Sequence, residues 1–123
     1  MDPALQTARY VNLVTVRKDG REVATPIWCV GLDGKLFAFT GAKLGKAKRI
    51  RATGRVKVAP CDARGGVRGA WSSGTGRVVT EAPLAARVMR EIGAKYGLQY
   101  RLLTVFAWLF RRLGDRVVLE MKV

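Results

Sequence analysis

The chain has 123 residues, of which 49% are apolar, and this favours a single domain with a hydrophobic core over a disordered segment. Its 23 lysine and arginine residues outnumber nine acidic residues, and the net charge of +14 indicates an acidic partner: a nucleic acid, a membrane surface or a polyanionic small molecule. Histidine is absent, which excludes Ser-His and Cys-His nucleophile pairs, HExxH zinc sites and histidine acid–base catalysis. An enzyme of this composition is therefore expected to rely on a cofactor. The alternative to an acidic partner is a solvated basic surface that only aids solubility.

Targeting and redox signals predict a cytoplasmic protein without a metal site. The two cysteines, Cys29 and Cys61, have no metal-type spacing, and a small secreted scaffold would contain more cysteines. Residues 1–4 lack the basic start and the apolar run of a signal peptide. The longest apolar run, from Leu102 to Phe110, is about half as long as a membrane-spanning helix requires.

The N-terminal part of the chain has the alternating pattern of three strands joined by tight hairpins. Pro26 lies inside the second strand, and because proline cannot donate to a ladder, it marks an edge, a bulge or the end of pairing. In the third strand, Phe37 and Phe39 share one face, whereas Leu36, Ala38 and Thr40 share the other. The predicted strands are Tyr10–Arg17, Glu22–Gly31 and Lys35–Thr40, and the Asp-Gly pairs at residues 19–20 and 33–34 supply positive φ angles for the turns.

The C-terminal part predicts strands and helices in mixed order. Gly74 and Gly76 suit a bulge or the corner of a barrel, Pro83 suits the first turn of a helix, and Gly97 can end that helix. Trp108 is expected to project from its helix toward a partner subunit. The predicted elements are strands over Arg55–Cys61, Arg68–Thr80 and Arg116–Val123, a helix with the apolar stripe Leu84, Val88, Ile92 and Tyr96, and a second helical segment over Tyr100–Leu113 that faces the domain with Leu102, Phe106, Leu109 and Leu113. The final strand places Val117, Leu119, Met121 and Val123 on one face.

Taken together, the elements follow the order β-β-β-α-β-β-α-α-β in one domain over residues 1–123. Short strands joined by hairpins favour an antiparallel sheet, closed into a small barrel that removes its edges. The fold class expected is therefore mainly β with short helices.

The segment from Phe37 to Arg51 combines a strand, a loop containing Gly41 and Gly45, and a short basic helix. No acidic residue lies between Asp33 and Asp62, whereas eight basic residues do. Backbone N–H groups at the start of a helix attract anions, and lysine and arginine add full charges. The segment therefore predicts a phosphate site, although it contains neither the Walker sequence nor GxGxxG. An exposed amphipathic turn is the alternative, and nucleic-acid binding is disfavoured because aromatic residues do not alternate with the charges.

Two further stretches are candidates for a ligand site. In Thr25-Pro26-Ile27-Trp28, the strand interrupted by proline leaves backbone groups that can meet a planar ring, and Trp28 can wall it; a packed core tryptophan is the alternative. Cys61 follows Pro60 near basic residues, which are expected to lower the pKa of its thiol. Without histidine, a buried thiol that takes no part in catalysis is the favoured interpretation of Cys61.

An ordered set of motifs resembles one family. Residues 10–15 (YVNLVT), Asp-Gly at 19–20, TPIW at 25–28, FTG at 39–41, KAKRIR at 46–51, APCDARG at 59–65 and KYGLQY at 95–100 follow one another over most of the chain. Together they resemble the PPOX-class F420-dependent oxidoreductases, small relatives of pyridoxamine 5′-phosphate oxidase. The resemblance implies a split β-barrel that forms a homodimer, with two cofactor sites between the subunits. The cofactor implied is the deazaflavin F420, or in some relatives FMN, FAD or heme.

The resemblance also assigns candidate residues. A strand-end threonine and the basic residues after it contact the cofactor phosphate, and the TP-x-W strand lies beside the ring. By this resemblance, Thr40, Lys46, Arg49 and Arg51, with Lys43 and Lys48, bind the phosphate, and Thr25, Pro26, Ile27, Trp28, Pro60 and Cys61 lie near the ring.

The function implied is hydride transfer between F420 and an unsaturated organic substrate that the sequence does not identify. An FMN-dependent oxidoreductase of the same fold, a cofactor carrier without catalytic activity and a basic nucleic-acid-binding module are the alternatives. No C-terminal arm of the pyridoxamine phosphate oxidase kind is evident, which argues against pyridoxamine phosphate as the substrate.

Overall fold

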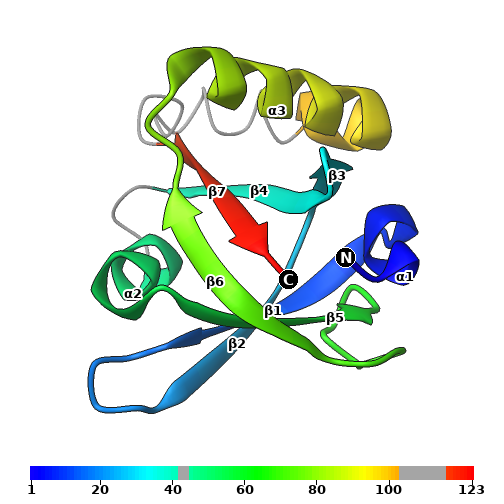
Figure 1. The fold of residues 1–123 in the computed structure, drawn as a ribbon. Helices are drawn as coiled ribbons and strands as arrows, with labels where there is room; N and C mark the ends of the chain where they lie inside the picture. Colours follow the sequence, from blue (N-terminus) through cyan, green and yellow to red (C-terminus); the bar gives the residue numbers. More distant parts are fainter. Residues whose placement is uncertain (42–44, 103–115) are drawn as a thin grey trace.

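The computed structural model of the protein describes residues 1–41, 45–102 and 116–123. Within these ranges, one sheet of seven strands forms the scaffold, and the helices α1, α2 and α3 lie around it (Figure 1). The elements are α1 (Pro3–Thr7), β1 (Tyr10–Val16), β2 (Glu22–Ile27), β3 (Val30–Leu32), β4 (Lys35–Gly41), α2 (Gly45–Thr53), β5 (Arg55–Cys61), β6 (Ser72–Val78), α3 (Ala82–Tyr96) and β7 (Arg116–Lys122).

The sheet is antiparallel and curled. Its strand order is β2-β1-β5-β6-β7-β4-β3, so β2 and β3 are the edge strands. These two edges are joined by only Trp28 and Cys29, because β2 ends at Ile27 and β3 begins at Val30. Three Cα steps span at most about 11 Å, so the sheet must curve until its edges approach each other at this point. The fold is therefore a split barrel, mainly β with short helices, as the sequence predicts.

Two predicted strands differ from the structure. The predicted strand Glu22–Gly31 is divided into β2 and β3, and the break comes directly after the edge residues Pro26 and Ile27. Proline leaves no N–H for a ladder, which explains why β2 is an edge strand and ends there. The predicted strand Arg68–Thr80 is shorter, since β6 covers only Ser72–Val78. The predicted element order also lacks α1, which Asp2 caps by accepting the N–H of Ala4 at 3.0 Å.

The two Asp-Gly hairpins differ in geometry. Asp33 and Gly34 both have positive φ angles, 54° and 76°, as the sequence predicts. In the first hairpin only Gly20 does, with φ of 91°, and Asp19 instead accepts the backbone N–H of Arg21 at 3.0 Å. In this hairpin the hydrogen bond to the Asp19 carboxylate stabilises the turn, and only one residue needs a positive φ angle.

Strand β6 bends at its glycines because it changes partner there. Its first half pairs with β5, and its second half, from Thr75 to Val78, pairs with β7. A Cβ on Gly74 would lie 1.8 Å from the carbonyl oxygen of Lys122, which no side chain tolerates. The regular register shows no bulge at these glycines, and Gly74 is needed because β7 approaches the backbone of β6 too closely for a side chain.

Two apolar clusters lie on opposite faces of β4 and β7. Leu36 and Ala38 join the cluster that includes Ile50 of α2, whereas Phe37 and Val118 join the cluster under α3. Figure 1 shows α2 and α3 on different sides of these strands. The predicted α3 stripe is confirmed, with Val88, Ile92 and Tyr96 buried and Leu84 packed beside them, and Leu119, Met121 and Val123 of the final strand share one cluster. The predictions for Phe106, Trp108, Leu109 and Leu113 lie outside the described residues. Residues 98–102 are helical, but Leu102, predicted to face the domain, is 52% exposed.

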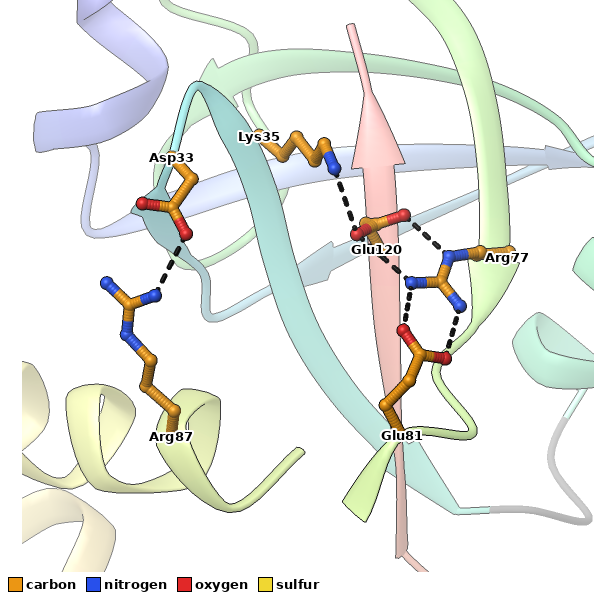
Figure 2. A network of polar contacts seen from close by, with 6 residues as sticks. All are labelled: Asp33, Lys35, Arg77, Glu81, Arg87 and Glu120. Atoms are coloured by element: carbon orange, nitrogen blue, oxygen red, sulfur yellow. Dashed lines mark hydrogen bonds and ion pairs between the residues drawn. The ribbon is translucent and has the colours of Figure 1, made fainter. Parts of the chain in front are cut away.

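Charged side chains tie α3 and the strands together (Figure 2). The Glu120 carboxylate is almost fully buried and lies between Arg77, at 2.6 Å, and Lys35, at 3.6 Å. Arg77 also pairs with Glu81 just before α3, at 2.7 Å. Every carboxylate in this network faces a cation, so the charges stabilise the junction rather than remain available.

In the described ranges, no helix has the length and apolarity needed to cross a bilayer.

Candidate cofactor site

A basic hollow lies between the β1–β2 hairpin and α2. Its volume is about 350 Å³. The hairpin contributes Arg17 and Lys18, and α2 contributes Lys48 and Arg49 together with Gly45 at its start. The hollow therefore combines four cationic side chains with the beginning of a helix, which is a favourable arrangement for an anion.

Helix α2 is fixed so that its cations line this hollow. Ala47 and Ile50 are buried against the sheet, which turns Lys48 outward. The Thr53 hydroxyl donates to the carbonyl of Val16 at 3.0 Å and ties the end of α2 to the end of β1. The same contact brings the helix beside the hairpin that begins at Arg17.

Arg49 is held in a defined position. Its Nε donates to the hydroxyl of Thr15, which is fully buried in β1, at 2.5 Å. The Arg49 guanidinium lies against Gly45 at the first turn of α2, where a Cβ would force this flexible group to shift. Thr15 therefore positions Arg49, and Gly45 leaves room for it in this position.

The positive charges of the hollow are not compensated within the described residues. No carboxylate there lies within ion-pair distance of Arg17, Lys18, Lys48 or Arg49. Burial and the charge of Arg17 lower the pKa of Arg49. Burial and the charge of Arg49 lower the pKa of Lys46. Burial is the larger cause of both shifts and the neighbouring cation adds to it, so a bound phosphate would favour the charged forms.

The structure separates the other predicted phosphate residues from this hollow. Lys46 is half-buried and Arg51 is exposed on α2, but neither lines the hollow. Lys43 lies outside the described residues. Thr40 is buried near the end of β4, and its hydroxyl has no hydrogen-bond partner within the described part of the chain. A buried unpaired hydroxyl is costly, so Thr40 is suited to bind a ligand group.

The TP-x-W strand and Pro60-Cys61 lie on either side of β1. Ile27 and Pro60 both pair with Val11, one from each neighbouring strand. The expected proximity of the two stretches is therefore seen in the register. Pro60 and Cys61 are the last residues of β5, and Thr25 and Pro26 lie on the edge strand β2.

Asn12 lies in the middle of this region, opposite Pro26 and Ala59. Its amide nitrogen donates to the carbonyl of Gly65 at 3.0 Å. Its side-chain oxygen is buried and accepts no hydrogen bond from the described residues. Asn12 thus offers a second unpaired polar atom, in this case an acceptor for a ligand N–H.

Trp28 is packed rather than free. Its ring stacks on that of Tyr96 in α3, with centroids 4.4 Å apart and planes 9° apart. The Tyr96 hydroxyl accepts the N–H of Cys29 at 2.9 Å and donates to the carbonyl of Arg9 at 2.8 Å. One face of Trp28 is therefore occupied by the protein, as in the packed alternative considered for this residue.

The expectation for the Cys61 thiol is wrong in sign. Burial, with a contribution from the Asp62 carboxylate, raises the pKa of Cys61, and the charge of Arg68 offsets this only in part. The sequence shows the basic neighbours but not the burial, which dominates. Cys61 is a buried thiol, as favoured on other grounds.

Sequence reasoning missed Arg17, Lys18 and Asn12. Arg17 and Lys18 belong to a hairpin far from the basic segment in sequence, and a turn of this composition indicates only an exposed loop. Asn12 interrupts the apolar pattern of β1, and a polar residue between buried positions was the available signal.

Comparison with known proteins identifies structures of similar fold and the family of the chain. Solved structures of similar fold include the heme storage protein HutZ from Vibrio cholerae (TM-score 0.72, 14% identity, covering 95% of this chain and 82% of HutZ). They also include a conserved hypothetical protein from Mycobacterium tuberculosis (TM-score 0.71, 23% identity, covering 98% and 79%), and an F420 reductase (TM-score 0.59, 19% identity, covering 95% and 87%). No curated protein matches the chain. The family model described as pyridoxamine 5′-phosphate oxidase matches residues 1–123, and the chain therefore belongs to the pyridoxamine 5′-phosphate oxidase family.

Proposed function

We propose that this protein is an oxidoreductase that binds F420 and transfers a hydride between this cofactor and an unsaturated organic substrate. The observation that carries the proposal is the basic hollow, in which Arg17, Lys18, Lys48 and Arg49 have no carboxylate partner in the described ranges. F420 carries a phosphodiester and a glutamate tail, so its charge is complementary. The F420 reductase among the structures of similar fold supports the same choice.

The residues of the site fit the two parts of such a cofactor. Lys48 and Arg49 would hold the phosphate from α2. The hydroxyl of Thr40, which lies outside the hollow, would donate a hydrogen bond to another polar group of the cofactor. The residues assigned by resemblance, Lys46 and Arg51, would extend the basic surface along the helix. The bound cofactor would supply the hydride chemistry, which requires no histidine.

The region around β2 would receive the ring. The unpaired oxygen of Asn12 would accept a ring N–H, and the edge strand at Thr25 and Pro26 would lie along the ring. Trp28 would contact the cofactor ring only with the part of its side chain that Tyr96 does not cover. Orientation and exclusion of water, rather than acid–base catalysis, would then be the task of the protein.

We also propose a homodimer in which each cofactor lies between two subunits. Val67 and Trp71 are 46% and 45% exposed. The ammonium group of Lys57, on β5, lies 5.9 Å from the centroid of the Trp71 ring. Large exposed apolar side chains of this kind support a subunit interface. Measurement of the mass in solution tests this part of the proposal.

FMN is the second candidate cofactor, because it also presents a phosphate and a flat tricyclic ring. Heme is disfavoured: the chain contains no histidine, so it cannot supply the most common iron ligand, although the similar structure of HutZ belongs to a heme storage protein. A cofactor carrier without catalysis would bind F420 but show no turnover with any substrate.

Fluorescence titration with F420 and with FMN, each at two salt concentrations, tests the assignment. We expect saturable binding of F420 that Arg17→Ala/Lys48→Ala weakens at least about tenfold, which corresponds to about 1.4 kcal/mol. Arg90→Ala/Lys122→Ala removes the same charge at two other exposed positions and should have little effect.

A second double variant, Lys46→Ala/Arg51→Ala, distinguishes the hollow from the rest of the basic helix. If it weakens binding as strongly as the first variant, the phosphate lies across the helix rather than in the hollow alone. Preference for FMN would change the cofactor, and loss of all binding at modest salt would favour a non-specific polyanion site. Wild-type affinity in both double variants would contradict the phosphate assignment.

A further inference from the structure

A second hollow lies between α3 and the beginning of β7, with a volume of about 330 Å³. It belongs to the apolar cluster under α3, on the face of the sheet opposite α2 and the basic hollow. Its size is within the range of small-molecule sites, roughly 300–1,000 Å³. It is lined by Val79, Ala85, Ala86, Met89, Tyr100, Arg116, Val117 and Val118.

Arg116 is the single charged residue among these lining positions in the described part of the protein. Its Nη1 is buried and has no hydrogen-bond partner in the described ranges. Its guanidinium carbon lies 5.7 Å from the centroid of the Phe39 ring, so an aromatic face supports one side of the group. No carboxylate of the described residues pairs with it.

The same strand shows how this protein treats a charge that it compensates internally. Glu120 lies four residues after Arg116 and therefore on the same face of β7. Arg77 and Lys35 both pair with Glu120. Arg116 has no such partner, and a buried guanidinium N–H without an acceptor lowers stability. Arg116 is half-buried, and an acceptor with negative charge would complete the contacts of its buried Nη1.

We propose that this hollow binds an amphipathic organic carboxylate. The carboxylate would pair with Arg116, for which a planar two-oxygen acceptor is the best match. The hydrocarbon body would contact the apolar side chains of Val79, Met89 and Val118. This site is separate from the proposed cofactor site, and it does not depend on that function.

Isothermal titration calorimetry of the full chain with decanoate, below its critical micelle concentration, tests the proposal. Decanol and acetate serve as comparisons, because each retains one half of the ligand. We expect one saturable decanoate site per chain, at least tenfold weaker binding of decanol, and no saturable binding of acetate. Arg116→Gln should weaken decanoate binding at least tenfold, and Arg90→Gln, on the exposed side of α3, should leave it unchanged.

Two further variants keep the test decisive. Ala86→Trp places a large side chain in the hollow without changing Arg116, and should abolish decanoate binding even if Arg116→Gln fails to fold. Arg17→Ala/Lys48→Ala should retain decanoate binding, which excludes the basic hollow as its source. Equal affinity for decanol, unchanged binding in Ala86→Trp, or no saturable binding by the wild type would each overturn the proposal.

Discussion

The two charged regions on opposite sides of this sheet differ in how their charges are paired. Around Glu120, two cations surround one buried carboxylate, and Glu81 pairs with Arg77 as well (Figure 2). In the basic hollow, Arg49 and Lys48 face other cations and no carboxylate of the described residues. The first arrangement is complete within the chain and contributes to stability. The second has no carboxylate partner among the described residues, so only the first cluster is neutralised internally, and the proposed anion would complete the second.

The largest expected effect is the difference in stability between a variant that removes a charge from the Glu120 cluster and one that removes a charge from the basic hollow. Glu120→Ala removes the partner of Arg77 and Lys35, and we expect unfolding to become easier by about 2–3 kcal/mol. Arg77 remains paired with Glu81, which keeps the loss below that of an isolated buried charge. Lys48→Ala should change stability by less than about 0.5 kcal/mol, because it removes repulsion together with helix propensity. Urea denaturation of both variants checks this, and equal losses would remove the distinction between the regions.

An added anion should stabilise the folded protein by binding in the basic hollow. Pyrophosphate at about ten times its dissociation constant should raise the free energy of unfolding by about 1.4 kcal/mol through preferential binding to the folded state. Arg17→Ala/Lys48→Ala should lose this gain, whereas Glu120→Ala should retain it. Thermal melts with and without pyrophosphate measure the difference. A gain of the same size in both variants would indicate a general salt effect.

Thr15 should act as a positioning residue for Arg49. Thr15→Val removes the acceptor of the Arg49 Nε, and we expect F420 affinity to fall a few-fold, equivalent to about 0.5–1 kcal/mol. Thr15→Ser keeps the hydroxyl and should restore the affinity, which a purely packing role of the methyl group would not explain. Fluorescence titration of the two variants, with melts to confirm folding, gives the result.

The smallest expected effect is the pH dependence that the paired cluster contributes to stability. Arg77 lowers the pKa of Glu81 to about 2 from an ordinary value of 4.5, and it also lowers the pKa of Glu120. Because these pKa values are depressed in the folded state, their contribution to stability is complete above about pH 5 and is lost as the pH falls toward 2. Glu81→Gln should therefore flatten the acid limb of a stability–pH curve. An unchanged acid limb would show that other carboxylates dominate it.

Local patterns in the sequence were sufficient for much of the scaffold. The Asp33-Gly34 turn, the strand over Arg55–Cys61 and the α3 stripe of Val88, Ile92 and Tyr96 are found where they were predicted. Each of these depends on neighbouring residues: a turn needs positive φ angles, and a strand or helix needs one apolar face. The clustering of cations on α2 was likewise visible, because these residues are close together in the chain.

The tertiary structure decided which distant residues meet, and sequence periodicity carries no record of that. It brought the hairpin at Arg17 beside α2, stacked Trp28 on Tyr96, and surrounded Glu120 with cations from β4 and β6. It also reversed the expected pKa shift of Cys61, since burial outweighs nearby positive charge. Such features depend on strand order and curvature, which are set by long-range pairing of the whole sheet. By itself the sequence determined the elements and their charge, whereas the packing of the sheet determined which charges were paired and which had no carboxylate partner among the described residues.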